Sequence, residues 1–203
     1  MRKGFTLLEL LIVIGILAIL STTMIVVINP AQLLKKARDS QRIADLSSLK
    51  TAIAYFVTET DNCSNAMGDT NHTYSDVASV SCDSRAAANS GSGDGSGYTT
   101  NGDGWIPIDF DGMTGGSPIG SLPHDPNPTS ATANPGRYYV YLVGSTSDYT
   151  FQLVANMEST YYSNGGAGDV ESNDGGNIST LYEIGTTNVL STTSANCYAG
   201  TGT

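Results

Sequence analysis

A single carboxylate interrupts the most apolar stretch of this chain. Glu9 lies near the start of a run from Thr6 to Ile28 that holds no other charged residue. A charged side chain at the centre of a membrane-spanning helix costs about 2.5–3.5 kcal/mol, and less near the end of the span. Glu9 is therefore a candidate functional residue; the alternative is an interfacial carboxylate that reaches the lipid headgroups.

The rest of the chain shows no catalytic motif. It contains two histidines, His72 and His124, and both lie in loop-like sequence. The G-x-S-x-G elbow, the P-loop and the HExxH zinc motif do not occur in it. We therefore do not expect an enzyme.

Charge is distributed unevenly. The formal net charge is -10, and from Thr51 onward Arg85 and Arg137 are the only basic residues among sixteen acidic ones. Such an acidic region is a poor match for a phosphate backbone, so no nucleic-acid partner is expected. Pro30–Lys50 instead holds five basic and two acidic residues. This segment could contact anionic lipid, meet the acidic heads of neighbouring copies, or remain solvated.

The apolar run has the length of a membrane-spanning helix. About twenty apolar residues cross the hydrocarbon core of a bilayer, which is about 30 Å thick. Arg2 and Lys3 precede the run, which predicts a cytoplasmic N-terminus. No small-residue cleavage site of the secretory type follows, and the run continues into a helical pattern. The sequence therefore predicts a membrane anchor.

Residues 2–20, RKGFTLLELLIVIGILAIL, resemble the class III signal of type IV prepilins and of the pseudopilins of type II secretion. By this resemblance, Gly4 precedes the cleavage point, and Phe5 is the new N-terminus that prepilin peptidase exposes and N-methylates. Glu9 is then the fifth residue of the mature chain. In a filament, Glu9 would pair with the Phe5 ammonium of a neighbour, because attraction between charges is strong in a low-dielectric interior. We expect this pair to fix the axial register of the subunits.

The resemblance also implies partners and a location. The partners would be other copies of the chain, related pilins, prepilin peptidase, and an inner-membrane assembly platform with its ATPase. The chain would cross the cytoplasmic membrane once before assembly and then form an extracellular filament at the cell surface. The implied function is a structural subunit of a type IV pilus (a fimbrium) or of a pseudopilus in protein secretion. The alternative is a minor pilin whose head is displayed for cell adhesion or DNA uptake.

A second helical segment is predicted directly after the span. Pro30 suits the first turn of a new helix, and with Gly15 it marks a point where the helix could kink. The segment from Ala31 to Val57 contains no Gly or Pro. Apolar residues recur at three- and four-residue steps and are predicted to pack on a sheet, with the residues before about Ile43 protruding. The stripe consists of Ile43, Leu46, Leu49, Ile53, Phe56 and Val57.

The fold class predicted is α+β, with a long helix packed on a small antiparallel sheet. The domains expected are a leader at 1–4, a transmembrane helix at 5–29, an amphipathic half at 30–58 and a head at 59–203. The head includes a long variable loop at 62–104, rich in Ser, Asn and Gly. The expected strands are Tyr138–Gly144, Tyr149–Ala155, Ser179–Ile184 and, as an edge because of Pro107, Trp105–Phe110.

The three cysteines, Cys63, Cys82 and Cys197, leave their pairing open. Outside the cytoplasm two would pair and one would be left over. Cys63–Cys82 closes the shortest loop and is weakly favoured; the alternative is three free thiols.

Two short segments of the head extend the resemblance. Residues 120–128, GSLPHDPNP, resemble the Leu-Pro-x-Asp-Pro turn of the major pseudopilins, and NDGGNISTLYEIGT resembles the tail of small pseudopilin-like proteins. In the major pseudopilins a calcium ion staples a C-terminal loop. Asp169, Glu171 and Asp174 could supply oxygens for such an ion. Their spacing does not match an EF-hand, so a solvated acidic loop is the favoured alternative, and no other cofactor is expected.

Overall fold

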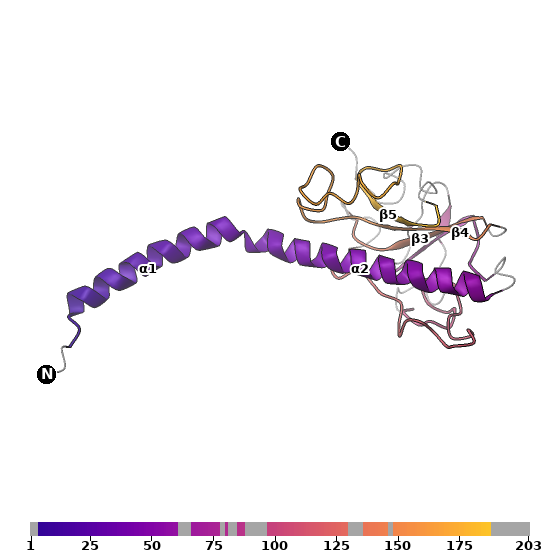
Figure 1. Cartoon of the computed structure of the whole chain (residues 1–203), viewed down its shortest axis with the longest axis horizontal. Coiled ribbons are helices and arrows are strands. Elements are labelled where there is room, and N and C mark those ends of the chain that lie inside the picture. The colour runs from indigo at the N-terminus through magenta and orange to yellow at the C-terminus, as the bar shows by residue number, and fades with distance from the viewer. Residues whose placement is uncertain are drawn as a thin grey trace.

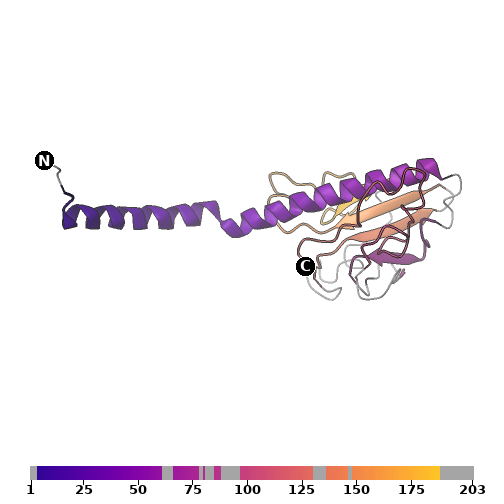
Figure 2. The ribbon, with the colours of Figure 1, turned by 90° about the horizontal axis from the view of Figure 1, so that it is seen from below.

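A long helix in two parts carries a head at its far end (Figure 1). The structure is a computed structural model, and it describes residues 4–60, 66–77, 80, 85–87, 97–129, 136–145 and 148–187. The first part, α1, projects away from the head, whereas the head lies along the second part, α2 (Figures 1 and 2).

Helix α1 runs from Leu7 to Ile28. Thr6 caps it, because its hydroxyl oxygen accepts a hydrogen bond from the backbone N–H of Glu9 at 3.2 Å. Ser21, Thr22 and Thr23 donate their hydroxyls to carbonyls of the preceding turn. These bonds satisfy polar side chains in a segment that is otherwise apolar.

The helix breaks at one residue, Asn29. Its φ of 44° and ψ of 73° place it in the left-handed region, which Asn tolerates better than most residues. It ends α1 and also caps α2, since its side-chain oxygen accepts from the N–H of Gln32 at 3.4 Å. Pro30 is the first residue of α2, which extends to Glu59. Helix α1 passes through Gly15 without interruption.

The head is a five-stranded sheet in the order β2-β1-β3-β4-β5. All neighbouring strands are antiparallel except β1 and β2, which are parallel. This arrangement, with α2 lying along the sheet, confirms the α+β prediction (Figure 2). The strands are β1 (His72–Ser75), β2 (Ala86–Ala87), β3 (Val140–Ser145), β4 (Thr150–Ala155) and β5 (Tyr182–Gly185).

One strand prediction is wrong. Trp105–Phe110 forms no strand; apart from one bridge between Asn101 and Asp109, it is irregular but buried. Pro107 has no N–H for a ladder, and the amides of Trp105 and Phe110 instead donate to the carbonyls of Gly97 and Thr100, both at 2.7 Å.

The range 62–104, expected as a long variable loop, contains two short strands, β1 and β2. Strand β1 pairs with β3, so it lies inside the sheet. Its four residues are held by a partner about seventy positions away, and a pattern this short does not show that pairing in the sequence.

The core lies on both faces of β3. Tyr139, Tyr141 and Val143 pack on the α2 side with Leu46, Leu49 and Ile53, whereas Val140 and Leu142 belong to a second cluster on the opposite face. This explains why β3 reads as a nearly continuous apolar run: a strand covered on both faces needs no polar alternation.

Candidate functional site: the projecting helix and its junction with the head

The segment that precedes α1 is open to solvent. Gly4 and Phe5 are both exposed, with Phe5 at 77%. No atom lies within 4 Å of where a side chain on Gly4 would begin. An extended, uncovered backbone of this kind can enter the cleft of a processing enzyme without unfolding the head. Residues 1–3 lie outside the described part of the chain.

Every described side chain of α1 is exposed. The window Leu7–Met24 has a mean hydropathy of 2.4 and is long and apolar enough to cross a membrane, although a signal sequence passes the same test. At 1.5 Å per residue, the 22 residues of α1 extend about 33 Å, close to the hydrocarbon thickness of a bilayer. The described part of the head does not cover this helix.

Glu9 lies in the first turn of α1. A carboxylate at this position interacts favourably with the positive end of the helix dipole. Phe5 and Glu9 belong to the same exposed N-terminal end of the molecule. Their pairing across two copies is not a property of a single chain, and it stays a prediction.

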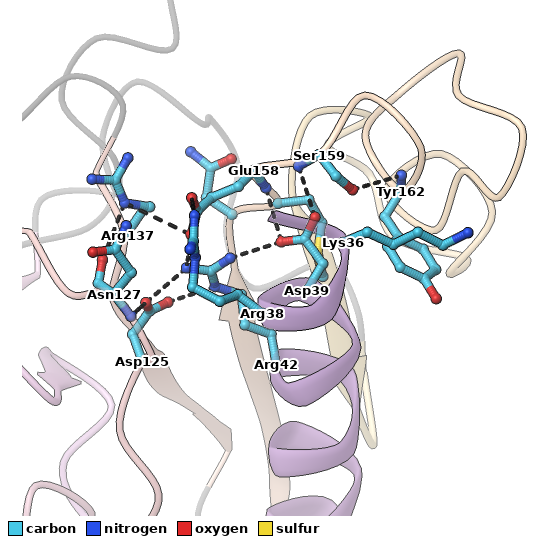
Figure 3. Close-up of polar contacts among 12 residues, drawn as sticks. Lys36, Arg38, Asp39, Arg42, Asp125, Asn127, Arg137, Glu158, Ser159 and Tyr162 are labelled. Carbon is cyan, nitrogen blue, oxygen red and sulfur yellow. Dashed lines mark hydrogen bonds and ion pairs between the residues drawn. The ribbon is translucent and has the colours of Figure 1, made fainter. Parts of the chain in front are cut away.

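A cluster of buried charges joins α2 to the head (Figure 3). We call it the ionic junction: Arg38, Asp39 and Arg42 on α2, with Asp125 and Glu158 on the head. Arg42 is fully buried. Its Nε and Nη2 donate to the two carboxylate oxygens of Asp125, both at 2.7 Å. Nη1 donates to Asp39 at 2.7 Å and Nη2 to Glu158 at 2.6 Å.

Glu158 is shared between two arginines. Arg38 Nε and Nη2 donate to its two oxygens at 2.9 and 2.6 Å, so this contact is also bidentate. Burial acts to raise the pKa of Glu158, but the hydrogen bonds from Arg38 and Arg42 outweigh it and lower the pKa to about 2. Burial likewise acts to lower the pKa of Arg42, and its bonds to Asp125 and Glu158 raise it overall.

Asp39 fastens the β4–β5 connection to the helix. Its oxygens accept from the backbone N–H groups of Glu158 at 2.9 Å and Ser159 at 2.7 Å (Figure 3). About two turns earlier, Gln32 accepts from the N–H of Thr160 at 3.3 Å. The head therefore contacts α2 from Gln32 onward, and the prediction that the helix protrudes until about Ile43 is wrong.

Asp125 comes from the Leu-Pro-x-Asp-Pro segment, and a second buried acid holds it. Asp76 accepts from the backbone N–H of Asp125 and of Tyr139, both at 2.7 Å. Burial raises the pKa of Asp76 to about 7, against the lowering effect of these two bonds. Trp105 Nε1 donates to the carbonyl of Pro123 at 2.9 Å, which further fixes the segment.

The sequence prediction missed this junction. The buried positions of α2 are 39, 42, 46, 49, 52, 53 and 56. Asp39 and Arg42 thus continue the three- and four-residue rhythm of the apolar stripe towards its N-terminal side. Charged residues in register with an apolar stripe were the signal that could have found them.

The three calcium candidates bind backbone instead. Asp169 accepts from the N–H of Gly165 at 2.8 Å and of Ser172 at 3.0 Å, and Glu171 accepts from Met157 and Asn164. Asp174 accepts from Gly176 and Glu183. Within the described ranges, no group of three or more metal-binding side chains converges. Calcium binding stays a prediction.

The three cysteines lie outside the described residues. Their pairing therefore also stays a prediction, as does the choice between a disulfide and free thiols.

Residues 1–25 match the family model of the prokaryotic N-terminal methylation motif. This motif is the class III prepilin signal of type IV pilins and pseudopilins, as the sequence resemblance indicated. No curated protein and no solved structure is significantly similar to the chain.

The chain therefore combines a prepilin signal with an exposed apolar helix that is long enough to span a membrane. Type IV pilins and pseudopilins carry this motif at their N-termini, and the matched residues of this chain are similar to theirs. The match ends within α1, so the head is described from its own structure alone.

Proposed function

We propose that this chain is a structural subunit of a type IV pilus or of a pseudopilus-like filament, assembled through α1. The observation that carries the proposal is the union of a prepilin signal with a 22-residue apolar helix, none of whose described side chains is covered by the head. Such a helix needs an external apolar environment. Lipid provides it before assembly, and the helices of other subunits provide it afterwards.

The proposed mechanism assigns separate tasks to the two ends of α1. Prepilin peptidase cleaves after Gly4, and the ammonium of Phe5 becomes the methylated N-terminus. Glu9 of an incoming subunit would then pair with the Phe5 ammonium of a neighbour. Because a buried charge without a partner is strongly destabilising, only one register satisfies both groups. Beyond the C-terminal end of α1, the ionic junction holds the head against α2.

The test is mass spectrometry of material sheared from cell surfaces. We compare wild type with Glu9→Ala and with the matched control Ser21→Ala, which changes a polar residue of α1 without removing charge. Wild type and Ser21→Ala should yield a chain that begins at Phe5 and whose mass exceeds that of the unmethylated chain by one methyl group. Glu9→Ala should yield none in the sheared fraction. A chain that begins at Met1, or that stays in membranes in all three strains, would contradict the proposal.

A second candidate function, a minor pilin with a displayed binding head, is favoured by one groove. A cavity of about 430 Å³ lies between α2 and the segment at 119–124, with Asp45 and His124 in its lining. Tyr139 donates its hydroxyl to Asp45 at 2.8 Å, and the His124 ring lies 4.9 Å from the ring of Tyr98. A carboxylate and an imidazole in the lining of one groove suit a small polar ligand.

This candidate is tested by surface adhesion of cells that carry Asp45→Ala or His124→Ala. If the head is displayed for binding, adhesion falls while the yield of sheared filaments stays at the wild-type level. Adhesion that is unchanged in both variants would exclude this groove as the binding site.

A further inference from the structure

We infer that the end of the head nearest α1 docks on the lipid headgroups of the membrane before the subunit is assembled. The surface concerned, the basal surface, consists of Leu33, Leu34, Lys35 and Lys36 on α2 and Tyr161 on the β4–β5 connection. The inference rests on the membrane-anchored state in the proposed function and adds a partner for the head: an anionic phospholipid surface.

The distance along the chain between the apolar helix α1 and the head is short. Helix α1 ends at Ile28, and the head already contacts α2 at Gln32 through Thr160. Four residues of helix advance only about 6 Å. The headgroup region on each side of a bilayer is of similar depth. A chain inserted through α1 must therefore hold the β4–β5 connection at the height of the headgroups; Figures 1 and 2 show this connection at the α1 side of the head.

The basal surface exposes large apolar and aromatic side chains. Leu33 and Leu34 are 60% and 62% exposed, although they lie in the first turns of a helix that buries its apolar residues further on. Tyr161 is 38% exposed. Leucine, tyrosine and lysine side chains together suit the boundary between hydrocarbon and water, where each has an apolar body and Tyr and Lys have a polar tip.

The basal surface also carries positively charged side chains. The amine of Lys36 lies 3.3 Å from the centre of the Tyr161 ring, so it is held over the connection (its neighbour Tyr162 is drawn in Figure 3). The nearby carboxylates Asp39 and Glu158 are bound to Arg42 and Arg38 within the ionic junction. Lys35 and Lys36 therefore add two positive charges to this end of an acidic protein, against the partly exposed carboxylate of Asp169 on the same connection, and anionic membrane surfaces attract such basic residues.

The experiment places tryptophan at matched sites in the full-length chain, reconstituted into phosphatidylglycerol-containing vesicles. One set of vesicles carries lipids brominated on the acyl chain near the headgroup, which quench tryptophan on contact. Tyr161→Trp reports the basal surface. Tyr55→Trp is the control, because Tyr55 is also exposed, at 49%, but lies near the opposite end of α2. Leu17→Trp reports insertion of α1, and the signal of the buried Trp105 is subtracted.

We expect quenching of Tyr161→Trp to be at least twofold stronger than that of Tyr55→Trp, and independent of the protein-to-lipid ratio. Adding Lys35→Glu and Lys36→Glu should remove most of this difference. Equal quenching at both sites, with strong quenching of Leu17→Trp, would overturn the inference and leave the proposed filament function intact. Quenching that appears only when protein is crowded would also overturn it, since the partner would then be a second copy.

The remaining outcome separates the two proposals. If Leu17→Trp is not quenched, α1 does not insert, and both the filament function and the basal surface are contradicted. If Tyr161→Trp is quenched as expected but no processed chain is recovered from sheared material, only the filament function is contradicted.

Discussion

Helices α1 and α2 meet at one residue and have opposite relations to the rest of the chain. Every described side chain of α1 is exposed, including large apolar residues such as Leu7 at 82%. In α2 the exposed positions alternate with a buried stripe that ends in Phe56. Helix α2 therefore forms part of the folded head, whereas the described side chains of α1 do not, and Asn29 is the boundary between the two.

The largest expected effect comes from removing Arg42, on the α2 side of the comparison. Arg42→Ala leaves the buried carboxylates of Asp39 and Asp125 without their cation, whereas Glu158 keeps Arg38. Breaking such a pair costs about 3–5 kcal/mol in the free energy of unfolding. The measurement is urea unfolding of the full chain in detergent, followed by Trp105 fluorescence. Gln41→Ala, at the exposed neighbouring position, is the control. A loss below about 1 kcal/mol for Arg42→Ala would mean that the junction does not hold the head to the helix.

The next prediction compares one leucine from each helix. Leu49 is fully buried, so Leu49→Ala should destabilise the head by about 2–5 kcal/mol. Leu17 is 55% exposed in α1, and Leu17→Ala should leave unfolding of the head unchanged within about 0.5 kcal/mol. Both are measured by the same urea titration. Similar losses for the two variants would show that α1 contributes to the folded core, and the contrast between the helices would fail.

The head should also lose stability as pH rises from 5 to 8. Burial raises the pKa of Asp76 to about 7, well above its value in an unfolded chain. A raised carboxyl pKa contributes stability that is fully present below the unfolded pKa, near 4, and is lost as pH passes through the folded pKa. Burial also raises the pKa of Glu171 and Glu183 to about 7, so these groups act in the same direction.

For Asp76 alone, two pH units at roughly 1.4 kcal/mol each make this loss about 3 kcal/mol, and urea midpoints at several pH values measure it. Asp76→Asn should reduce the pH dependence by the part that Asp76 contributes, whatever its effect on absolute stability, whereas Asp103→Asn, at an exposed loop position, should not change it. The lowered pKa of Glu158 acts oppositely, but only below about pH 4.5, because its stabilisation is lost as the carboxylate is protonated. A stability that rises from pH 5 to 8 would contradict the burial of Asp76.

The sequence predicted the parts of the fold that local patterns encode. The stripe at Leu46, Leu49, Ile53 and Phe56 is buried as expected, and strands β3 and β4 lie within one or two residues of their predicted ends. The N-terminal signal was recognisable because a basic leader, Gly4, Glu9 and an apolar segment follow one another at the spacing of the prepilin motif. These features depend on neighbours in the chain.

What escaped prediction depends on distant partners. The ionic junction brings together positions 39, 42, 125 and 158, and no single segment shows that its charges will be neutralised by the others. The basic residues of Pro30–Lys50 were consistent with contact to lipid, with contact to neighbouring heads or with exposure to solvent. In the structure, Arg38 and Arg42 instead pair with carboxylates of the same chain. Strand β1 escaped for the same reason, since four residues form a strand only where β3 is beside them.

The smallest expected effect concerns calcium, which would act on the head alone. Each of Asp169, Glu171 and Asp174 already accepts at least two hydrogen bonds, so an ion would have to compete with bonds that close the loop. We therefore expect millimolar calcium, added to chelator-treated protein, to raise the melting temperature by less than about 2 °C, roughly half the shift that 1 kcal/mol produces in a domain of this size. Glu171→Gln should lower it by more, because one buried N–H would lose its acceptor. A larger calcium shift that Asp169→Asn abolishes would show instead that the ion staples this loop.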